Sequence, residues 1–143
     1  MSDLYHRVLR AHKWIYENSR GLAGHRLLFG NPTLLLHTVG RRSGLPRTTA
    51  LTYARDGRAY LVVASAGGAP TPPDWLANLE ARPECSIRIG PRTRRARARI
   101  TLPADPDYAR RWSILDAVNK GRFTTHQQKT QRTIPIVELE PTT

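Results

Sequence analysis

Cysteine is almost missing from this sequence of 143 residues, which contains Cys85 alone. One cysteine forms no disulfide framework within the chain and no cysteine-rich metal site, so the sequence fits a reducing compartment and predicts a cytoplasmic protein. The five histidines show no metal-ligand spacing with one another or with Cys85, and no Gly-x-Ser-x-Gly elbow occurs. We therefore expect neither a metal site nor hydrolytic chemistry.

Long hydrophobic runs are missing as well. Near the start of the chain, Asp3, Arg7 and Lys13 interrupt every apolar stretch, which disfavours a secretion signal and a membrane span. The apolar residues between them recur at helical spacing and predict an amphipathic helix over residues 3–20. Its polar face is basic, so the helix either packs on its own domain or makes a peripheral contact with a membrane surface.

Acidic residues and lysines are scarce, whereas arginine is abundant. The chain has 23 Lys+Arg against 11 Asp+Glu, a net charge of +12, and its lysines are only Lys13, Lys120 and Lys129. Because the planar guanidinium suits phosphate and carboxylate groups, an anionic ligand, a nucleic acid or an anionic membrane would each fit this charge. A high arginine share also follows from some genome base compositions, so the charge alone does not choose a partner.

Apolar and β-branched runs separated by turn signals predict one mainly β domain over residues 1–143. We expect strands at Thr33 to Val39, Arg47 to Tyr53, Ala59 to Ser65, Glu84 to Gly90, Thr93 to Leu102 and Ile134 to Leu139. The first three should form an antiparallel meander. We expect helices from Pro73 to about Ala81 and from Asp105 to about Asn119, and a loop over residues 66–73. The pattern predicts a small antiparallel β-barrel of about six strands with flanking helices.

A cationic turn joins the first two expected strands. It reads Gly40-Arg41-Arg42-Ser43-Gly44, and Arg47 follows three residues later. Glycines at both ends of a short polar run indicate a tight hairpin, which places three guanidinium groups and a hydroxyl close together as a phosphate cradle. A solvated turn with surface arginines explains the spacing equally well. The pattern is not a Walker phosphate loop.

Two further segments have a ligand interpretation beside a plainer one. Ser65-Ala66-Gly67-Gly68 offers backbone amides to the carbonyl groups of a planar ring, because glycine lets a ligand approach the main chain closely, or it is a flexible connector. Trp75 either stacks on such a ring or anchors its short helix in the core. For a lone tryptophan, the core is the better interpretation.

The expected strand over residues 93–102 alternates Arg95, Arg97 and Arg99 with apolar residues, so one of its faces is cationic. This pattern admits a basic nucleic-acid-binding module, whose affinity would depend steeply on salt. Residues 88–99 contain no aromatic side chain on which a base could stack. A solvated or dimer-facing strand is the simpler interpretation, and we expect no nucleic-acid partner.

Four motifs in this order resemble the deazaflavin-dependent nitroreductase family of actinobacteria, over residues 34–141. They are Thr38-Val39-Gly40-Arg41-Arg42-Ser43-Gly44 with Arg47, Ser65-x-Gly67-Gly68, Pro73-x-Trp75-x-x-Asn78-Leu79 with Pro83, and Thr130-x-Arg132-x-Ile134-Pro135. The resemblance implies a split β-barrel of the flavin-reductase type, usually a homodimer. It also implies that the protein binds the 8-hydroxy-5-deazaflavin coenzyme F-420 and reduces a small-molecule acceptor, either a quinone, a nitroaromatic or an activated alkene.

Carried over by position, the resemblance implies two sets of cofactor-binding residues. The phosphate contacts would come from Arg41, Arg42, Ser43 and Arg47, and the ring contacts from Ser65, Ala66, Gly67, Gly68, Pro73, Asp74, Trp75 and Asn78. Such sites need no catalytic triad, because the coenzyme supplies the chemistry.

The sequence departs from the family pattern at two places. Ala66 stands where the family often has lysine, and Lys120, Phe123 and His126 stand where one branch has tyrosines over the ring. We therefore expect a different acceptor pocket. His126 or Tyr53 is the candidate proton donor, with solvent as the alternative. On the same fold, flavin mononucleotide (FMN), haem or another tetrapyrrole remains an alternative ligand.

Overall fold

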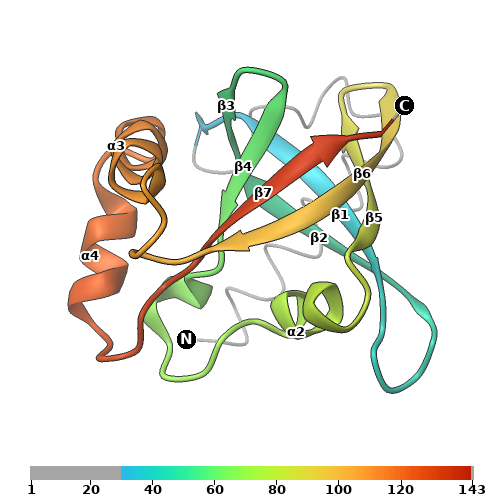
Figure 1. The fold of residues 1–143 in the computed structure, drawn as a ribbon, viewed down its shortest axis with the longest axis horizontal. Helices are drawn as coiled ribbons and strands as arrows, with labels where there is room; N and C mark the ends of the chain where they lie inside the picture. Colours follow the sequence, from blue (N-terminus) through green and yellow to red (C-terminus); the bar gives the residue numbers. More distant parts are fainter. Residues whose placement is uncertain (1–29, 143) are drawn as a thin grey trace.

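The computed structural model describes residues 30–142 (Figure 1), and the helix expected over residues 3–20 lies outside them. In chain order the elements are β1 (Thr33–Val39), β2 (Pro46–Thr52), β3 (Ala54–Asp56), β4 (Ala59–Val63), η2 (Ala66–Gly68), α2 (Asp74–Ala81), β5 (Glu84–Ile89), β6 (Arg92–Thr101), α3 (Tyr108–Val118), α4 (Arg122–Gln128) and β7 (Ile136–Pro141). The six expected strands are therefore confirmed to within two residues at each end, and so are the helices after Pro73 and before Asn119 to within three.

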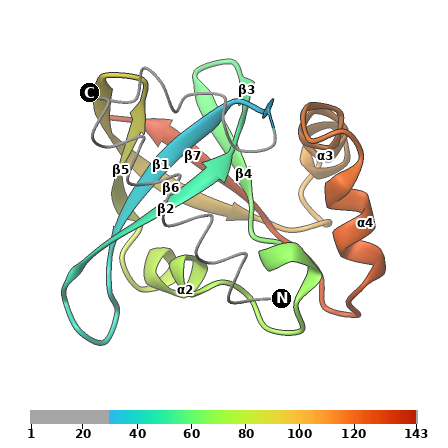
Figure 2. The same cartoon turned by 180° about the vertical axis from the view of Figure 1, so that it is seen from behind.

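The strands form one antiparallel sheet of seven, in the order β2-β1-β5-β6-β7-β4-β3. Residues of β2 also contact β4, so the sheet curls round toward a barrel, as Figures 1 and 2 show from opposite sides. The mainly β class and the barrel are confirmed. The additional strand is β3, a piece of three residues that pairs only with β4.

The expected meander of the first three strands is wrong. The hairpins β1–β2 and β3–β4 both form, but β2 lies at one edge of the sheet and β4 lies near the other, between β3 and β7. All five residues of β4 are buried, so this strand needs neighbours on both sides. One of those neighbours is the C-terminal strand, with Tyr60 opposite Leu139 and Val63 opposite Ile136.

Two short helical segments were not expected from the sequence. The loop after β4 contains η2, a 3₁₀ turn, at its first residues, so the expectation of a loop over residues 66–73 needs this correction. The helix α4 has the sequence RFTTHQQ, of which only Phe123 is buried. A single apolar residue produces no periodicity, and this is why the pattern did not indicate a helix.

Among the described residues the hydrophobic core has two large clusters, separated by the sheet, and a small third one of Leu35 and Ala50. Inside the barrel, residues such as Leu36, Val62 and Ile87 pack against the buried side chains of α2, which closes one mouth of the barrel. Outside, α3 and α4 cover β3, β4 and β7, and their Leu115 and Phe123 pack there. Each large apolar side chain buried in this way contributes roughly 1.5–3 kcal/mol. The inner core thus fixes α2 beside the ends of β1 and β4.

A candidate coenzyme site at one end of the barrel

The turn between β1 and β2 is held by its own hydrogen bonds. The Gly40 amide donates to the Leu45 carbonyl at 2.8 Å, and the Gly44 amide donates to the Gly40 carbonyl at 2.8 Å. The Leu45 amide donates to Ser43 Oγ at 3.1 Å. The Ser43 hydroxyl therefore supports the turn and still has a proton to donate, and the arginines around it project from a fixed frame.

The three arginines of this hairpin differ in how much they are engaged. Within residues 30–142, Arg42 and Arg47 are exposed and have neither an ion pair nor a side-chain hydrogen bond. Arg41 lies 3.7 Å from a carboxylate oxygen of Asp74, whose own side chain is 91% exposed, and donates to Asn78 Oδ1 at 3.3 Å. The hairpin thus presents two uncompensated cations and a third that is loosely held, an arrangement suited to an anion.

The helix α2 is docked onto the end of β1 through Asn78, which is buried. Its Oδ1 atom accepts from the Arg41 amide at 3.1 Å, and its Nδ2 atom donates to Thr38 Oγ1 at 3.3 Å. Trp75 lies inside the barrel core, as the plainer interpretation of this residue predicts. Four residues of this segment, Pro73, Asp74, Trp75 and Asn78, were expected to contact the ring of the coenzyme. Of these, Asp74 is exposed and Pro73 is half-buried, so these two have surface that a ligand could touch.

The backbone after β4 adopts an uncommon conformation. Ala66, Gly67 and Gly68 have φ values of +47°, +67° and +85°, which a residue with a side chain such as Ala66 rarely adopts. The amides of Gly68 and Ala69 donate to Ser65 and Ala66 carbonyls, whereas those of Ala66 and Gly67 have no acceptor in the described part of the chain. Beyond Gly67 and its two chain neighbours, no atom of residues 30–142 lies within 4 Å of the place where a Gly67 side chain would be. The loop thus offers two free N–H groups and open space.

Arg132 fixes this loop from behind. Its Nε atom donates to the Ala69 carbonyl at 2.9 Å, one Nη atom to the Ser65 carbonyl at 2.7 Å, and both Nη atoms to the Ala64 carbonyl at 3.3 Å. Burial lowers the pKa of the guanidinium below its ordinary value. Three carbonyl groups of the loop are therefore occupied. The sequence reasoning did not assign Arg132 to the site, although the Thr130-x-Arg132 motif contains it.

His126 approaches the same loop from α4. Its Nδ1 atom lies 3.1 Å from the hydroxyl of Ser65, a residue that is only 5% exposed. A side chain on Gly68 would lie 2.6 Å from the His126 carbonyl oxygen, so the two segments meet only because that residue is glycine. Burial, with the charges of Lys129 and Arg122, lowers the pKa of His126 below its ordinary value. The imidazole is therefore neutral at neutral pH.

Tyr53, the other candidate proton donor, lies elsewhere. Its ring meets the edge of Tyr60 with the centroids 5.7 Å apart. Tyr60 is near the start of β4, whereas Ser65 follows the end of that strand, roughly 15 Å further at ordinary strand spacing. The structure therefore brings His126, but not Tyr53, to the loop.

The structure gives less support to the nucleic-acid interpretation of the arginines on β6. On β6, Arg97 pairs with Glu84 at 2.7 Å, and Arg99 pairs with Glu138 at 3.2 Å and Asp105 at 3.3 Å, so two cations of that face are neutralised.

Within residues 30–142, no cluster of His, Cys, Asp and Glu could hold a metal ion. Over the same residues, no helix is long and apolar enough to cross a membrane.

The hairpin tip, α2, η2 and the end of α4 all lie at the same end of the barrel in both views (Figures 1 and 2). Exposed cations and unpaired amides from segments far apart in the sequence thus lie at the same end of the barrel. A negatively charged molecule with a ring that carries carbonyl groups fits these donors, because the arginines can bind its anionic group and the amides can donate to its ring carbonyls.

Comparison with known proteins agrees with this chemistry. A family model described as F420H(2)-dependent quinone reductase matches residues 8–141. An F420H(2)-dependent quinone reductase of Mycobacterium tuberculosis (strain ATCC 25618 / H37Rv) is 49% identical over 133 residues, which cover 93% of this chain and 89% of that protein.

Two solved structures share the fold. A structure of an F420-H2 dependent reductase (FDR-A) is 29% identical with a TM-score of 0.68, over 76% of this chain and 94% of that one. A second, described as a domain-swapped dimer, is 26% identical with a TM-score of 0.71, over 98% and 100%. The split barrel and the resemblance to deazaflavin-dependent reductases are thereby confirmed, and the chain belongs to the F420H(2)-dependent quinone reductase family of oxidoreductases.

Proposed function

We propose that this protein holds reduced coenzyme F-420 at the end of the barrel described above and that it reduces a quinone there. The observation that carries the proposal is the presence of uncompensated guanidinium groups on the β1–β2 hairpin and of unpaired amides after β4 at the same end of the barrel. When bound, the reduced deazaflavin supplies a hydride. Every other contribution comes from the chain itself.

The hairpin supplies the binding energy for the anionic part of the coenzyme. Arg42 and Arg47 have no internal counterion to give up within the described residues, so each can form a charge-assisted hydrogen bond worth roughly 1.5–3 kcal/mol. Arg41 joins them by exchanging its weak contact with the exposed Asp74. The Ser43 hydroxyl can donate to the same group while it accepts from Leu45.

The loop after β4 orients the ring. Its free amides, those of Ala66 and Gly67, are donors for ring carbonyl oxygens, and Arg132 holds the loop in the conformation that leaves them free. A backbone fixed in this way before the ligand arrives loses little freedom on binding. Orientation of the reactants is a large part of the rate enhancement in such enzymes.

Reduction of a quinone to a hydroquinone takes up one hydride and one proton. Because the pKa of His126 is lowered, its imidazolium form is scarce at neutral pH, so we assign the proton to solvent. His126 is then a positioning residue that fixes the hydroxyl of Ser65 beside the loop. Tyr53 has no role in this proposal, because it lies with Tyr60.

The proposal extends to the assembly and to the range of acceptors. We propose a cytoplasmic homodimer, supported by the related structure that is described as a domain-swapped dimer. Light scattering on the purified protein tests the dimer directly. Nitroaromatics and activated alkenes are further acceptors to screen beside quinones.

The proposal is tested by titrating the protein with coenzyme F-420 and with FMN, and by repeating the titration on Arg42→Ala and Arg47→Ala. Each variant should bind F-420 at least about fivefold more weakly, which corresponds to the loss of about 1 kcal/mol from one charge-assisted contact. The matched control is Arg95→Ala, an exposed arginine on β6 outside the site, which should bind normally. Unchanged F-420 affinity in both hairpin variants, or tighter binding of FMN, would contradict the proposal.

A further inference from the structure

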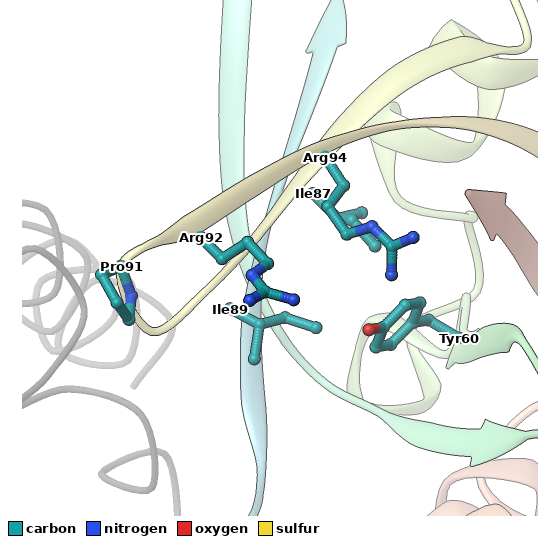
Figure 3. A pocket seen from close by; sticks show the side chains of 6 residues that line it. All are labelled: Tyr60, Ile87, Ile89, Pro91, Arg92 and Arg94. Atoms are coloured by element: carbon teal, nitrogen blue, oxygen red, sulfur yellow. The ribbon is translucent and has the colours of Figure 1, made fainter. Parts of the chain in front are cut away.

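A cavity lies at the opposite mouth of the barrel from α2. It has a volume of about 330 Å³, within the size range of sites for small ligands. Figure 3 shows the described residues that line it, which are Tyr60, Ile87, Ile89, Pro91, Arg92 and Arg94. Mouths of β-barrels are common places for such sites, because side chains fill the middle of the barrel and leave room at the ends.

The cavity combines an apolar wall with cations. In the β5–β6 ladder, Ile87 lies opposite Arg94 and Ile89 lies opposite Arg92. The four side chains therefore share one face of the two strands, and Figure 3 shows both guanidinium groups on the side of the Tyr60 ring. None of the described residues that line the cavity is a carboxylate. An occupant with an apolar body and a negative charge would pack on the apolar wall and pair with Arg92, which is exposed and has no ion pair within residues 30–142.

The aromatic wall is fixed before any ligand arrives. Arg55 donates from Nη1 to the Tyr60 hydroxyl at 3.2 Å, and its Cζ atom lies 4.1 Å from the centre of the same ring. Tyr53 meets that ring edge-on. Contacts of this kind hold a side chain in one orientation, which lowers the cost of stacking a planar ligand on it.

The cavity is separate from the candidate coenzyme site. Its lining includes no residue of the β1–β2 hairpin, the loop after β4, α2 or α4. The strand β5 begins at Glu84, just after α2, and the cavity lies at its other end beside Ile89. That length of strand is roughly 15 Å, and Figure 1 shows the β5–β6 turn and α2 at opposite ends of the barrel.

We propose that this cavity is a second ligand site, and that it takes an aromatic carboxylate or sulfonate. The aromatic rings of such a ligand pack between Tyr60 and the two isoleucines, and its anionic group reaches Arg92 at the rim. A guanidinium binds a carboxylate or sulfonate through paired N–H donors, so the charge and the shape of the ligand are recognised together. The site goes beyond the proposed function, because neither the coenzyme nor its acceptor occupies it.

The test uses 8-anilinonaphthalene-1-sulfonate, an aromatic sulfonate whose fluorescence rises in an apolar site, titrated into the full-length protein. Arg92→Gln should bind this probe about tenfold more weakly, as expected for the loss of one charge-assisted contact. The matched control is Arg95→Gln, which changes an exposed arginine on the opposite face of β6 and should bind as the unchanged protein does. The uncharged analogue N-phenyl-1-naphthylamine should bind at least about tenfold more weakly than the sulfonate.

Two outcomes overturn this inference. One is equal binding of the sulfonate by Arg92→Gln and Arg95→Gln, which would show that the probe reports only general apolar surface. The other is displacement of the probe by saturating F-420, which would show that the two sites are one. F-420 affinity is measured on Arg92→Gln in the same series and should be unchanged, so a failure of the coenzyme proposal is seen separately.

Discussion

The arginines of the β1–β2 hairpin and those of α3 differ in whether carboxylates neutralise their charge. On α3, Arg111 has a side chain that is 9% exposed and donates to Asp56 at 2.8 Å and to Glu138 at 2.9 Å. Arg110 makes two bonds of 3.0 Å to Asp56. On the hairpin, Arg42 and Arg47 are exposed and have no such partner among the described residues.

This difference shows that the net charge of +12 is not spread evenly over the molecule. Where carboxylates surround a guanidinium, its charge holds two elements together, as Arg111 holds α3 to β3 and β7. Where no carboxylate faces it, the charge remains available to a ligand. The same substitution should therefore cost folding free energy in one region and ligand affinity in the other.

The largest effect is expected for Arg111→Met. This change removes the two charge-assisted hydrogen bonds of a buried guanidinium, each worth roughly 1.5 kcal/mol or more, so we expect a loss of about 3 kcal/mol. Arg110 still binds Asp56, and Arg99 still binds Glu138. Urea denaturation followed by circular dichroism measures the loss. Coenzyme affinity of the folded fraction should not change. A loss below about 1 kcal/mol would mean that the pair behaves as an exposed one.

The next effect is expected for the double variant Arg42→Ala/Arg47→Ala. F-420 should bind about 30-fold more weakly, which corresponds to about 2 kcal/mol, because two charge-assisted contacts are lost. The free energy of unfolding should stay within about 0.5 kcal/mol of the original, as for exposed side chains without partners. Isothermal titration and urea denaturation on one preparation compare the two quantities. A large loss of stability with normal binding would reverse the assignment of the two regions.

A third test uses pH. Hydrogen bonds from Arg110 and Arg111, which outweigh the opposing effect of burial, lower the pKa of Asp56 below its ordinary value of 3.8. As the pH falls, the unfolded chain therefore takes up this proton first. The stabilisation is complete above about pH 5 and disappears as the pH falls through the folded value. Urea denaturation at several pH values should show a flatter acid limb for Asp56→Asn, and an unchanged limb for Arg42→Ala.

The smallest effect is expected for Arg97→Ala. Its pair with Glu84 has a distance of 2.7 Å, but both side chains are more than half exposed, and such pairs contribute less than about 1 kcal/mol. Neither unfolding nor F-420 binding should change measurably. If this variant lost as much stability as Arg111→Met, ion-pair distance rather than burial would decide the effect.

Much of the fold could be predicted because its signals are local. Alternating apolar residues identify a strand wherever it later pairs, and Pro73 with Arg82-Pro83 brackets α2. The order of the strands in the sheet, by contrast, cannot be predicted from local sequence. Nothing in the residues of β4 indicates that it pairs with β7, which is separated from it by about half of the chain. The helix α4 was missed because its only buried residue is Phe123.

Many residues of the candidate site could be predicted from the sequence, but the role of each residue in the structure was harder to predict. The cationic hairpin and the glycine loop follow from residue types and turn signals, and Arg42 and Arg47 are exposed as that interpretation requires. The sequence could not show that Asn78 docks α2, that Trp75 lies in the core, or that Arg132 holds three carbonyl groups of the loop. These roles depend on which backbone atoms lie within about 3 Å of a side chain.

By itself, the sequence determined the strand and turn pattern, the arginine-rich hairpin and the family, because each of these rests on neighbouring residues and their order. Only the tertiary structure decided which arginines have counterions, that His126 rather than Tyr53 lies near the loop, and that a cavity lies at the far mouth of the barrel. Charge compensation and cavity shape are properties of distance in space. They arise when segments that are distant in the sequence pack against one another, and the sequence of one segment does not show which other segments it will contact.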